Sequence, residues 1–504
     1  MRLFLFAIGG SGSRVLKSLA MLCAAGVKPV DPATGKPYEN LEIIPIIVDP
    51  HQAGRDVKRT VELLEAYRKI HNMLYAGNRA PEGFFSTKIT TLAALMPKGS
   101  GALRDSFLYN MTAVERLRFR EFIEFNNLDE SNLALMQMLF SSAQLDTSMH
   151  IGFVGSPNIG SVALNRFKES DEFRAFGNLL GENDRIFFIS SIFGGTGAAG
   201  FPIMVKNIRA ASDSTLTSRG YMRTAPTGAL TLLPYFNIEH SRTSPINKAD
   251  FLLKTRSALH YYAKSLTAAG GERQVDSIYY LGDRVTSSPY VNDPGEGGQL
   301  NAAHLIELIG AMAPLHFLAT PDSDLGREAR AFEYGLAVDT NNVDFQSFDP
   351  RTRSMIAAPL LRLHLLTLFL DHKLKDCIGR GFTKDTPSIG REFLSTDFYQ
   401  TLSNHFLPKY WDWLEEMDEN NRHVTLFDLE TAGKLENIVK GIPAKKGFLT
   451  GSRLTYDDLF ARINSVSKKY NGKFTPAQLP LKLLQTFHIA VSQIIDERFP
   501  ALND

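Results

Sequence analysis

The sequence is poor in cysteine. Cys23 and Cys377 are the only two in 504 residues, and they lack the CxxC or Cys/His spacing of a redox or zinc site. We therefore expect the protein to work in a reducing, cytoplasmic environment.

An excess of charge of one sign is also missing. Lys and Arg number 55 against 54 Asp and Glu, for a formal net charge of +1. No global field therefore attracts the chain to nucleic acid or to an anionic membrane. Any partner must be recognised locally.

Long apolar runs are absent as well. The apolar residues 3–8 are fewer than the core of a signal peptide, and they end at a glycine. The later stretch APLLRLHLLTLFL is interrupted by Arg362 and His364, so no segment offers the ~20 apolar residues of a membrane span. We expect a soluble protein.

Two familiar site motifs are missing. The chain contains no GxxxxGK[ST] phosphate loop, and its 12 histidines include no HExxH pair. The first absence excludes a P-loop nucleoside triphosphatase, and the second disfavours a metal hydrolase.

Alternating strand-like and helical patterns are what the sequence does contain. RLFLFAI and LEIIPIIVD are typical of buried strands, and each precedes a helical pattern. MHIGFVG, RIFFISSI, ALTLLPYF and DSIYYLG continue the strand series. The fold class predicted is α/β, with a Rossmann-type parallel sheet covered by helices. Such sheets bind ligands at the carboxyl ends of their strands.

The length predicts two or three domains. A loop rich in Gly, Pro and Ser covers residues 285–299 and leads into a helical pattern in which Pro314 predicts a kink or an early end. We expect a nucleotide-binding domain over residues 1–298, a connecting helix over 299–318 and a mainly helical second domain over 319–504.

The first strand ends in a glycine-rich loop, AIGGSGS. The backbone N–H groups of such a loop can bind phosphate at a helix N-terminus, although a simple tight turn explains the glycines equally well. The loop does not fit the GxGxxG fingerprint, which disfavours a dehydrogenase or a methyltransferase. Its residues are Gly9, Gly10, Ser11, Gly12 and Ser13.

Three further loops could hold phosphate or its counter-ion. Asp49 ends the second strand, where an aspartate either caps a helix or holds Mg²⁺. PKGSGALRD contributes Gly99, Ser100, Gly101 and Arg104, and is either a phosphate clamp or an ordinary flexible loop. FGGTGAAG contributes Gly194, Gly195, Thr196, Gly197 and Ala198 after the buried run RIFFIS.

FGGTGAAG resembles the GGGTG(S/T)G signature of the tubulin/FtsZ superfamily, with Phe193 in place of the first glycine. LLPYFNIEHSR is similar to the ribose loop of that family, and YYLGDRV and QLNAAHLIELIGA are similar to the elements around its long central helix. The resemblance covers roughly residues 1–370. It implies a tubulin-like fold that binds GTP or GDP with Mg²⁺, with contacts from Glu239, Arg242, Asp283 and Asn301.

DTNNVDFQSFDP resembles the catalytic loop of the same family. The resemblance implies that Asp344 and Asp349 act on the nucleotide of a neighbouring subunit in a head-to-tail filament. Ser347 stands where the second acid is expected, and a capped turn explains NNVD equally well. The alternative is a nucleotide-binding scaffold that neither hydrolyses nor polymerises and that signals to a protein partner through its helical C-terminal half.

Overall fold

The computed structural model describes most of the chain. The described residues are 1–52, 54–75, 82–97, 103–111, 114, 116–150, 152–153, 156–238, 248–266, 274–284, 289–290, 301–325, 336, 340–429, 433–446 and 453–502. The predicted site residues Gly99, Ser100, Gly101, Glu239 and Arg242 lie outside them.

A six-stranded sheet lies at the centre of the molecule, in the order β5-β4-β1-β6-β7-β9, and all its pairings are parallel. Its strands are β1 (Arg2–Ile8), β4 (Glu42–Val48), β5 (Lys88–Ile89), β6 (Arg185–Ser191), β7 (Thr227–Leu232) and β9 (Ser277–Leu281). Numbered along the chain, the sheet strands run 3-2-1-4-5-6, which is the Rossmann order. The predicted α/β class is therefore confirmed.

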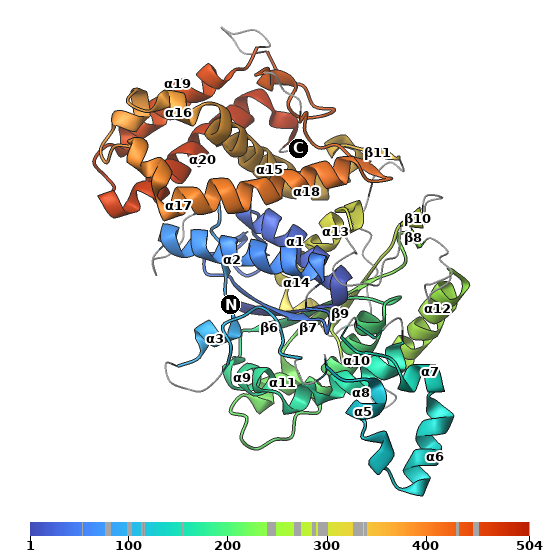
Figure 1. The fold of residues 1–504 in the computed structure, drawn as a ribbon. Helices are drawn as coiled ribbons and strands as arrows, with labels where there is room; N and C mark the ends of the chain where they lie inside the picture. Colours follow the sequence, from blue (N-terminus) through green and yellow to red (C-terminus); the bar gives the residue numbers. More distant parts are fainter. Residues whose placement is uncertain are drawn as a thin grey trace.

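Helices cover both faces of the sheet. Figure 1 shows α1 and α2 on one face, and α8, α9, α10 and α11 on the other. The strands between them are buried on both sides, which explains their continuous apolar runs. The helices of this part are α1 (Gly9–Ala24), α2 (Arg55–Tyr75), α3 (Leu92–Leu95), α5 (Phe119–Phe122), α6 (Glu130–Leu139), α7 (Ser142–Leu145), α8 (Pro157–Leu164), α9 (Asp171–Leu179), α10 (Gly195–Arg209), α11 (Arg219–Thr224), α12 (Lys248–Ser265), α13 (Leu305–Gly310) and α14 (Met312–Ala319).

The second half of the chain is mainly helical, as predicted. It comprises α15 (Pro350–His372), α16 (Leu374–Cys377), α17 (Asp397–Gln400), α18 (Leu407–Asp418), α19 (Tyr456–Ser467) and α20 (Leu479–Arg498). These helices pack over α1 and α2 (Figure 1), where the indole N–H of Trp413 donates a hydrogen bond to Ser18 Oγ at 3.1 Å. One continuous hydrophobic core therefore joins the two halves.

One helix, α15, is long and apolar enough to cross a membrane. Of its most apolar window, 78% is buried inside the protein. The helix thus has the burial expected of a core helix.

Two predicted elements differ from the structure. In MHIGFVG the described residues form no strand, because the backbone turns at Gly152, whose φ is +89°. The helix expected from residue 299 is regular only from Leu305, after His304 caps it, and it breaks at Ala311. The break precedes Pro314 by three residues, which agrees with the predicted kink, because proline cannot donate to the preceding turn.

Short two-stranded pairings complete the structure. HVTLFDL contributes only β12 (His423–Val424), which pairs with β11 (Asn342–Val343). The others are β2 (Val30–Asp31) with β3 (Lys36–Pro37), and β8 (Asn237–Ile238) with β10 (Pro289–Tyr290).

Candidate functional site

The two most glycine-rich loops meet at the centre of the sheet. The chain order reverses between the neighbouring strands β1 and β6, and Gly9 follows β1 while Gly194 follows β6. A methyl group placed on Gly9 would lie 3.6 Å from the backbone nitrogen of Gly197 and 3.7 Å from Thr196 Cβ. The first and the last of the predicted loops thus form one site, at the position where open α/β sheets bind ligands.

Two helices begin at this site. The residues before them, Ile8 and Gly194, make no side-chain cap hydrogen bond in the described part of the chain. The first turns of α1 and α10 contain no acidic residue. Backbone N–H groups without a side-chain cap, together with the positive ends of two helix dipoles, favour an anionic ligand here.

The glycines of the two loops have different roles. A Cβ on Gly12 would lie 2.8 Å from the carbonyl oxygen of Ile189, and one on Gly197 would lie 2.6 Å from that of Ser191. These two glycines therefore let α1 and α10 pack closely on the sheet, whether or not a ligand binds. Gly9 has a φ of +76°, and a Cβ on Gly10 would meet no atom within 4 Å in the described structure. Gly9 is buried against the start of α10, whereas Gly10 leaves an open approach to the backbone.

The start of α10 is enclosed by two other segments. A Cβ on Gly152 would lie 4.0 Å from Thr196 Oγ1. From the other side, the hydroxyl of Tyr262 on α12 donates to the carbonyl oxygen of Ala198 at 3.1 Å. Sequence reasoning missed the segment around Gly152, because its apolar residues indicated a strand. The glycine within that run was the available sign of a turn.

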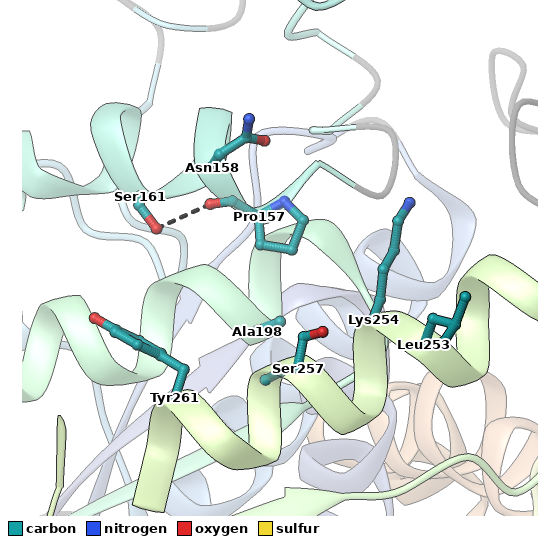
Figure 2. Close-up of a pocket in the computed structure, with 9 residues that line it drawn as sticks. Pro157, Asn158, Ser161, Ala198, Leu253, Lys254, Ser257 and Tyr261 are labelled. Atoms are coloured by element: carbon teal, nitrogen blue, oxygen red, sulfur yellow. Dashed lines mark hydrogen bonds between the residues drawn. The ribbon is translucent and has the colours of Figure 1, made fainter. Parts of the chain in front are cut away.

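A cavity of about 430 Å³ opens beside the same turn of α10. Figure 2 shows Pro157 and Ser161 of α8 facing Tyr261 and Ser257 of α12 across it, with Ala198 between them. The cavity is therefore formed partly by the glycine loop and partly by two helices that carry no predicted site residue.

Asp49 lies at the end of β4, next to β1. Its carboxylate is buried, and burial raises its pKa to about 7, against the opposing effect of the hydrogen bond that it accepts from the His51 N–H at 2.9 Å. Among the described residues, no three His, Cys, Asp or Glu side chains are grouped closely enough to hold a metal ion. A cation at Asp49 would therefore need most of its ligands from a bound phosphate and from water.

Behind the first loop, α1 takes part in a buried polar cluster. Arg14 is ion-paired with Glu307, and its Nη2 lies 3.3 Å from the hydroxyl of Tyr235. Tyr235 belongs to the segment predicted to contact ribose, and it also bonds Glu307 at 3.3 Å. Burial raises the pKa of Glu307 against the opposing effect of Arg14. This cluster fixes the position of the Tyr235 segment relative to α1.

The two residues predicted to contact the base have partners within the chain. Asn301 Nδ2 donates to Asp56 Oδ2 at 2.7 Å, and Asp283 is ion-paired with Arg422. Asp283 and Arg422 are both nearly buried, and their pair links the sheet to the C-terminal half. The nucleotide contacts of Asn301 and Asp283 remain predictions.

The two acids predicted to be catalytic act as helix caps. Asp344 Oδ1 accepts hydrogen bonds from the backbone N–H and the hydroxyl of Ser347, at 3.0 and 2.9 Å. Asp349 Oδ1 accepts from the N–H groups of Arg351 and Thr352 at the start of α15. This is the capped turn that the sequence also allowed. Arg104 is exposed in an irregular segment.

No protein-family model matches the chain, and no curated protein is similar to it.

Proposed function

We propose that the protein is a tubulin-like GTP-binding protein whose nucleotide phosphates lie between Gly9, Gly10 and the first turn of α10. The observation that carries the proposal is the meeting of two helix N-termini at the point where the strand order reverses. Such a site offers backbone donors and two helix dipoles to a polyphosphate. Both cysteines are free and buried, in keeping with the proposed cytoplasmic location.

Mg²⁺ fits the proposal through Asp49. A bound cation would favour the ionised carboxylate, whose charge burial now disfavours. The proposed role of Asp49 is to hold the cation or its waters while phosphate oxygens complete the coordination.

Base recognition is the part of the proposal that requires a change in existing contacts. Asn301 is bonded to Asp56, so guanine must either replace this contact or add to it. An asparagine amide can donate to guanine and accept from it. We therefore propose Asn301 as the base-reading residue and the Tyr235 segment as the ribose contact.

For hydrolysis we propose that Asp344 or Asp349 orients water on the nucleotide of a neighbouring subunit, in a filament of identical copies. Asp344→Asn tests this sharply, because the amide oxygen keeps the cap on Ser347 while the charge is lost. We expect unchanged GTP affinity and slower phosphate release. Unchanged release in both Asp344→Asn and Asp349→Asn would exclude these residues as catalysts.

A second candidate function has support of its own. Both acids are engaged in caps, and Lys17 of α1 is ion-paired with Glu416 of α18 at 3.1 Å. A buried charge thus links the glycine-loop helix to the C-terminal half. This arrangement favours a nucleotide-binding scaffold that passes its ligand state to a protein partner through the helical half.

The deciding experiment is a calorimetric titration with GTP, ATP and NAD in Mg²⁺, with phosphate release and light scattering followed in the same samples. GTP-selective binding with release and scattering supports the polymerising GTPase. Binding without either supports the scaffold. If no nucleotide binds, the glycines of the two loops have only a structural role in turns.

Gly10 provides the matched pair of variants. Gly10→Asp adds a carboxylate in the first turn of α1. Its negative charge interacts favourably with the helix dipole and stabilises the helix by about 0.3–1 kcal/mol, but it repels phosphate. Gly10→Asn has nearly the same shape without the charge. We expect the aspartate to weaken GTP binding at least about tenfold more than asparagine, a difference of about 1.4 kcal/mol. Equal affinities in two folded variants would place the phosphates elsewhere.

A further inference from the structure

Helix α6 exposes apolar side chains to solvent. All ten residues of α6 are described and none is buried, and Leu135, Met138 and Leu139 are 46%, 84% and 56% exposed. At about 100° per residue, these three lie within an arc of about 100°. Figure 1 shows α6 projecting from the end of the molecule away from the C-terminal helices. A projecting apolar stripe of this kind marks an interaction site.

The charges around α6 restrict the type of partner. Residues 121–165 contain no Lys or Arg, whereas five acids lie there: Glu121, Glu124, Asp129, Glu130 and Asp146. Of the arginines that flank this range, Arg120 is ion-paired with Asp146 and Arg166 lies over the ring of Phe122. Helix α6 itself carries no Lys or Arg, so its exposed face offers no cation to the phosphates of nucleic acid or of an anionic membrane. An apolar protein surface suits this face better.

The C-terminal half contains a hollow lined by both apolar and polar side chains. A cavity of about 620 Å³ lies between α15, α18 and the π-helix Thr401–Phe406. Leu368, Leu407, Leu429 and Trp411 line it, and its charged rim includes Asp371 and Lys375. The volume falls in the range of about 300–1,000 Å³ that is typical of pockets for drug-sized ligands. In Figure 1, α15 and α18 lie at the end of the molecule opposite to α6.

We propose that α6 of one copy docks into this cavity of a second copy. The stripe can lie against Leu368, Leu407 and Trp411 of the hollow. On the rim, Lys375 can pair with Glu130 or with the capping Asp129 of α6, provided that these acids lie away from Asp371. The net charge of +1 on 504 residues leaves no long-range repulsion between copies. The two surfaces lie at opposite ends, so the contact is heterologous and adds copies without closing.

This inference rests on the proposed self-assembly but not on nucleotide binding, and its contact includes neither Asp344 nor Asp349. It assigns the contact to residues for which the family resemblance implies no role.

The test uses full-length variants in sedimentation velocity. Met138→Asp places a charge in the stripe, and Gln137→Asp is its matched control, because Gln137 is exposed and lies about 200° from both Leu135 and Leu139. Asn404→Trp fills the cavity from its exposed rim, and Asn404→Ala is its control. Circular dichroism verifies that each variant is folded.

We expect the unmodified protein and both controls to associate as concentration rises, and Met138→Asp and Asn404→Trp each to remain monomeric. A 1:1 mixture of these two variants retains one intact stripe and one intact cavity, so it should form dimers that grow no further. Three results would each overturn the proposal. The mixture could contain monomers only, either variant could associate alone, or the unmodified protein could fail to associate both with and without GTP. Calorimetry with GTP on the same samples tests nucleotide binding separately.

Discussion

Replacing Asp49 by asparagine should make the protein more stable above neutral pH. Asp49 is 7% exposed, and the pKa of its carboxyl is raised from 3.8 to about 7, mainly by burial. Asp56 adds to the increase, whereas the N–H of His51 opposes it. Asparagine retains an oxygen for the His51 N–H and never ionises. The substitution therefore removes the charge and preserves the local turn.

The direction of the pKa shift determines whether Asp49 stabilises or destabilises the folded protein as pH changes. The folded protein holds the Asp49 proton more tightly than the unfolded chain does, so the folded state loses stability as pH rises from about 4 to about 7. A difference of about three pKa units corresponds to at most about 4 kcal/mol. Below pH 4 the carboxyl is neutral in both states, and the two proteins should have similar stability.

Urea unfolding of both proteins at several pH values between 4.5 and 8 measures the effect. We expect the free energies of unfolding to be similar at pH 4.5 and to separate by about 2–4 kcal/mol at pH 8, with the asparagine variant more stable. Mg²⁺ with GTP should narrow the gap, because a bound cation favours the ionised carboxylate of the unmodified protein. If the free energies of unfolding of the two proteins differed by the same amount at every pH in this range, the assignment of a buried, protonated Asp49 would be refuted.

Three further predictions concern buried contacts. Glu416→Gln leaves Lys17 and Arg59 without their shared carboxylate, and should lower the free energy of unfolding by about 3–5 kcal/mol in urea titrations. Gly12→Ala forces a methyl group against backbone and should cost about 1–3 kcal/mol, measured in the same way, whereas Gly10→Ala should cost little. His364 has no partner on either ring nitrogen among the described residues, and burial lowers its pKa to about 3. Because stability is then lost as pH falls from 6.5 towards 3, His364→Phe should unfold at lower pH than the unmodified protein in an acid titration.

The sheet and the central site were predictable for one physical reason. Strands buried on both faces are mostly apolar runs, as β1, β4 and β6 are, and β7 is fully buried although it contains two threonines. Helix α1 begins at Gly9 directly after β1, and α10 begins at Gly195, separated from β6 by three residues, so the loops could be located from local pattern alone. The two loops meet because β1 and β6 are neighbours in the sheet, and the α/β alternation of the sequence favours such a strand order.

The partners of individual polar residues could not be predicted in this way. Asn301 bonds Asp56, 245 residues away, and Asp283 pairs with Arg422, 139 residues away. Such pairs depend on how the C-terminal helices pack, for which local spacing gives no signal. MHIGFVG suggested a strand for a related reason: its described apolar residues, Met149 and Phe153, are buried but do not belong to the sheet.

The pairing of β1 with β6 also determines when the site can exist during synthesis. Arg2 N–H bonds Asp184, 182 residues later, so the first strand has no partner on that side until β6 has been made. At about 5–20 residues per second, the interval is on the order of 10–40 s. During this time one edge of β1 and the glycine loop behind it stay open on the ribosome. We therefore expect chaperone binding to nascent chains to fall only after residue 191 has emerged.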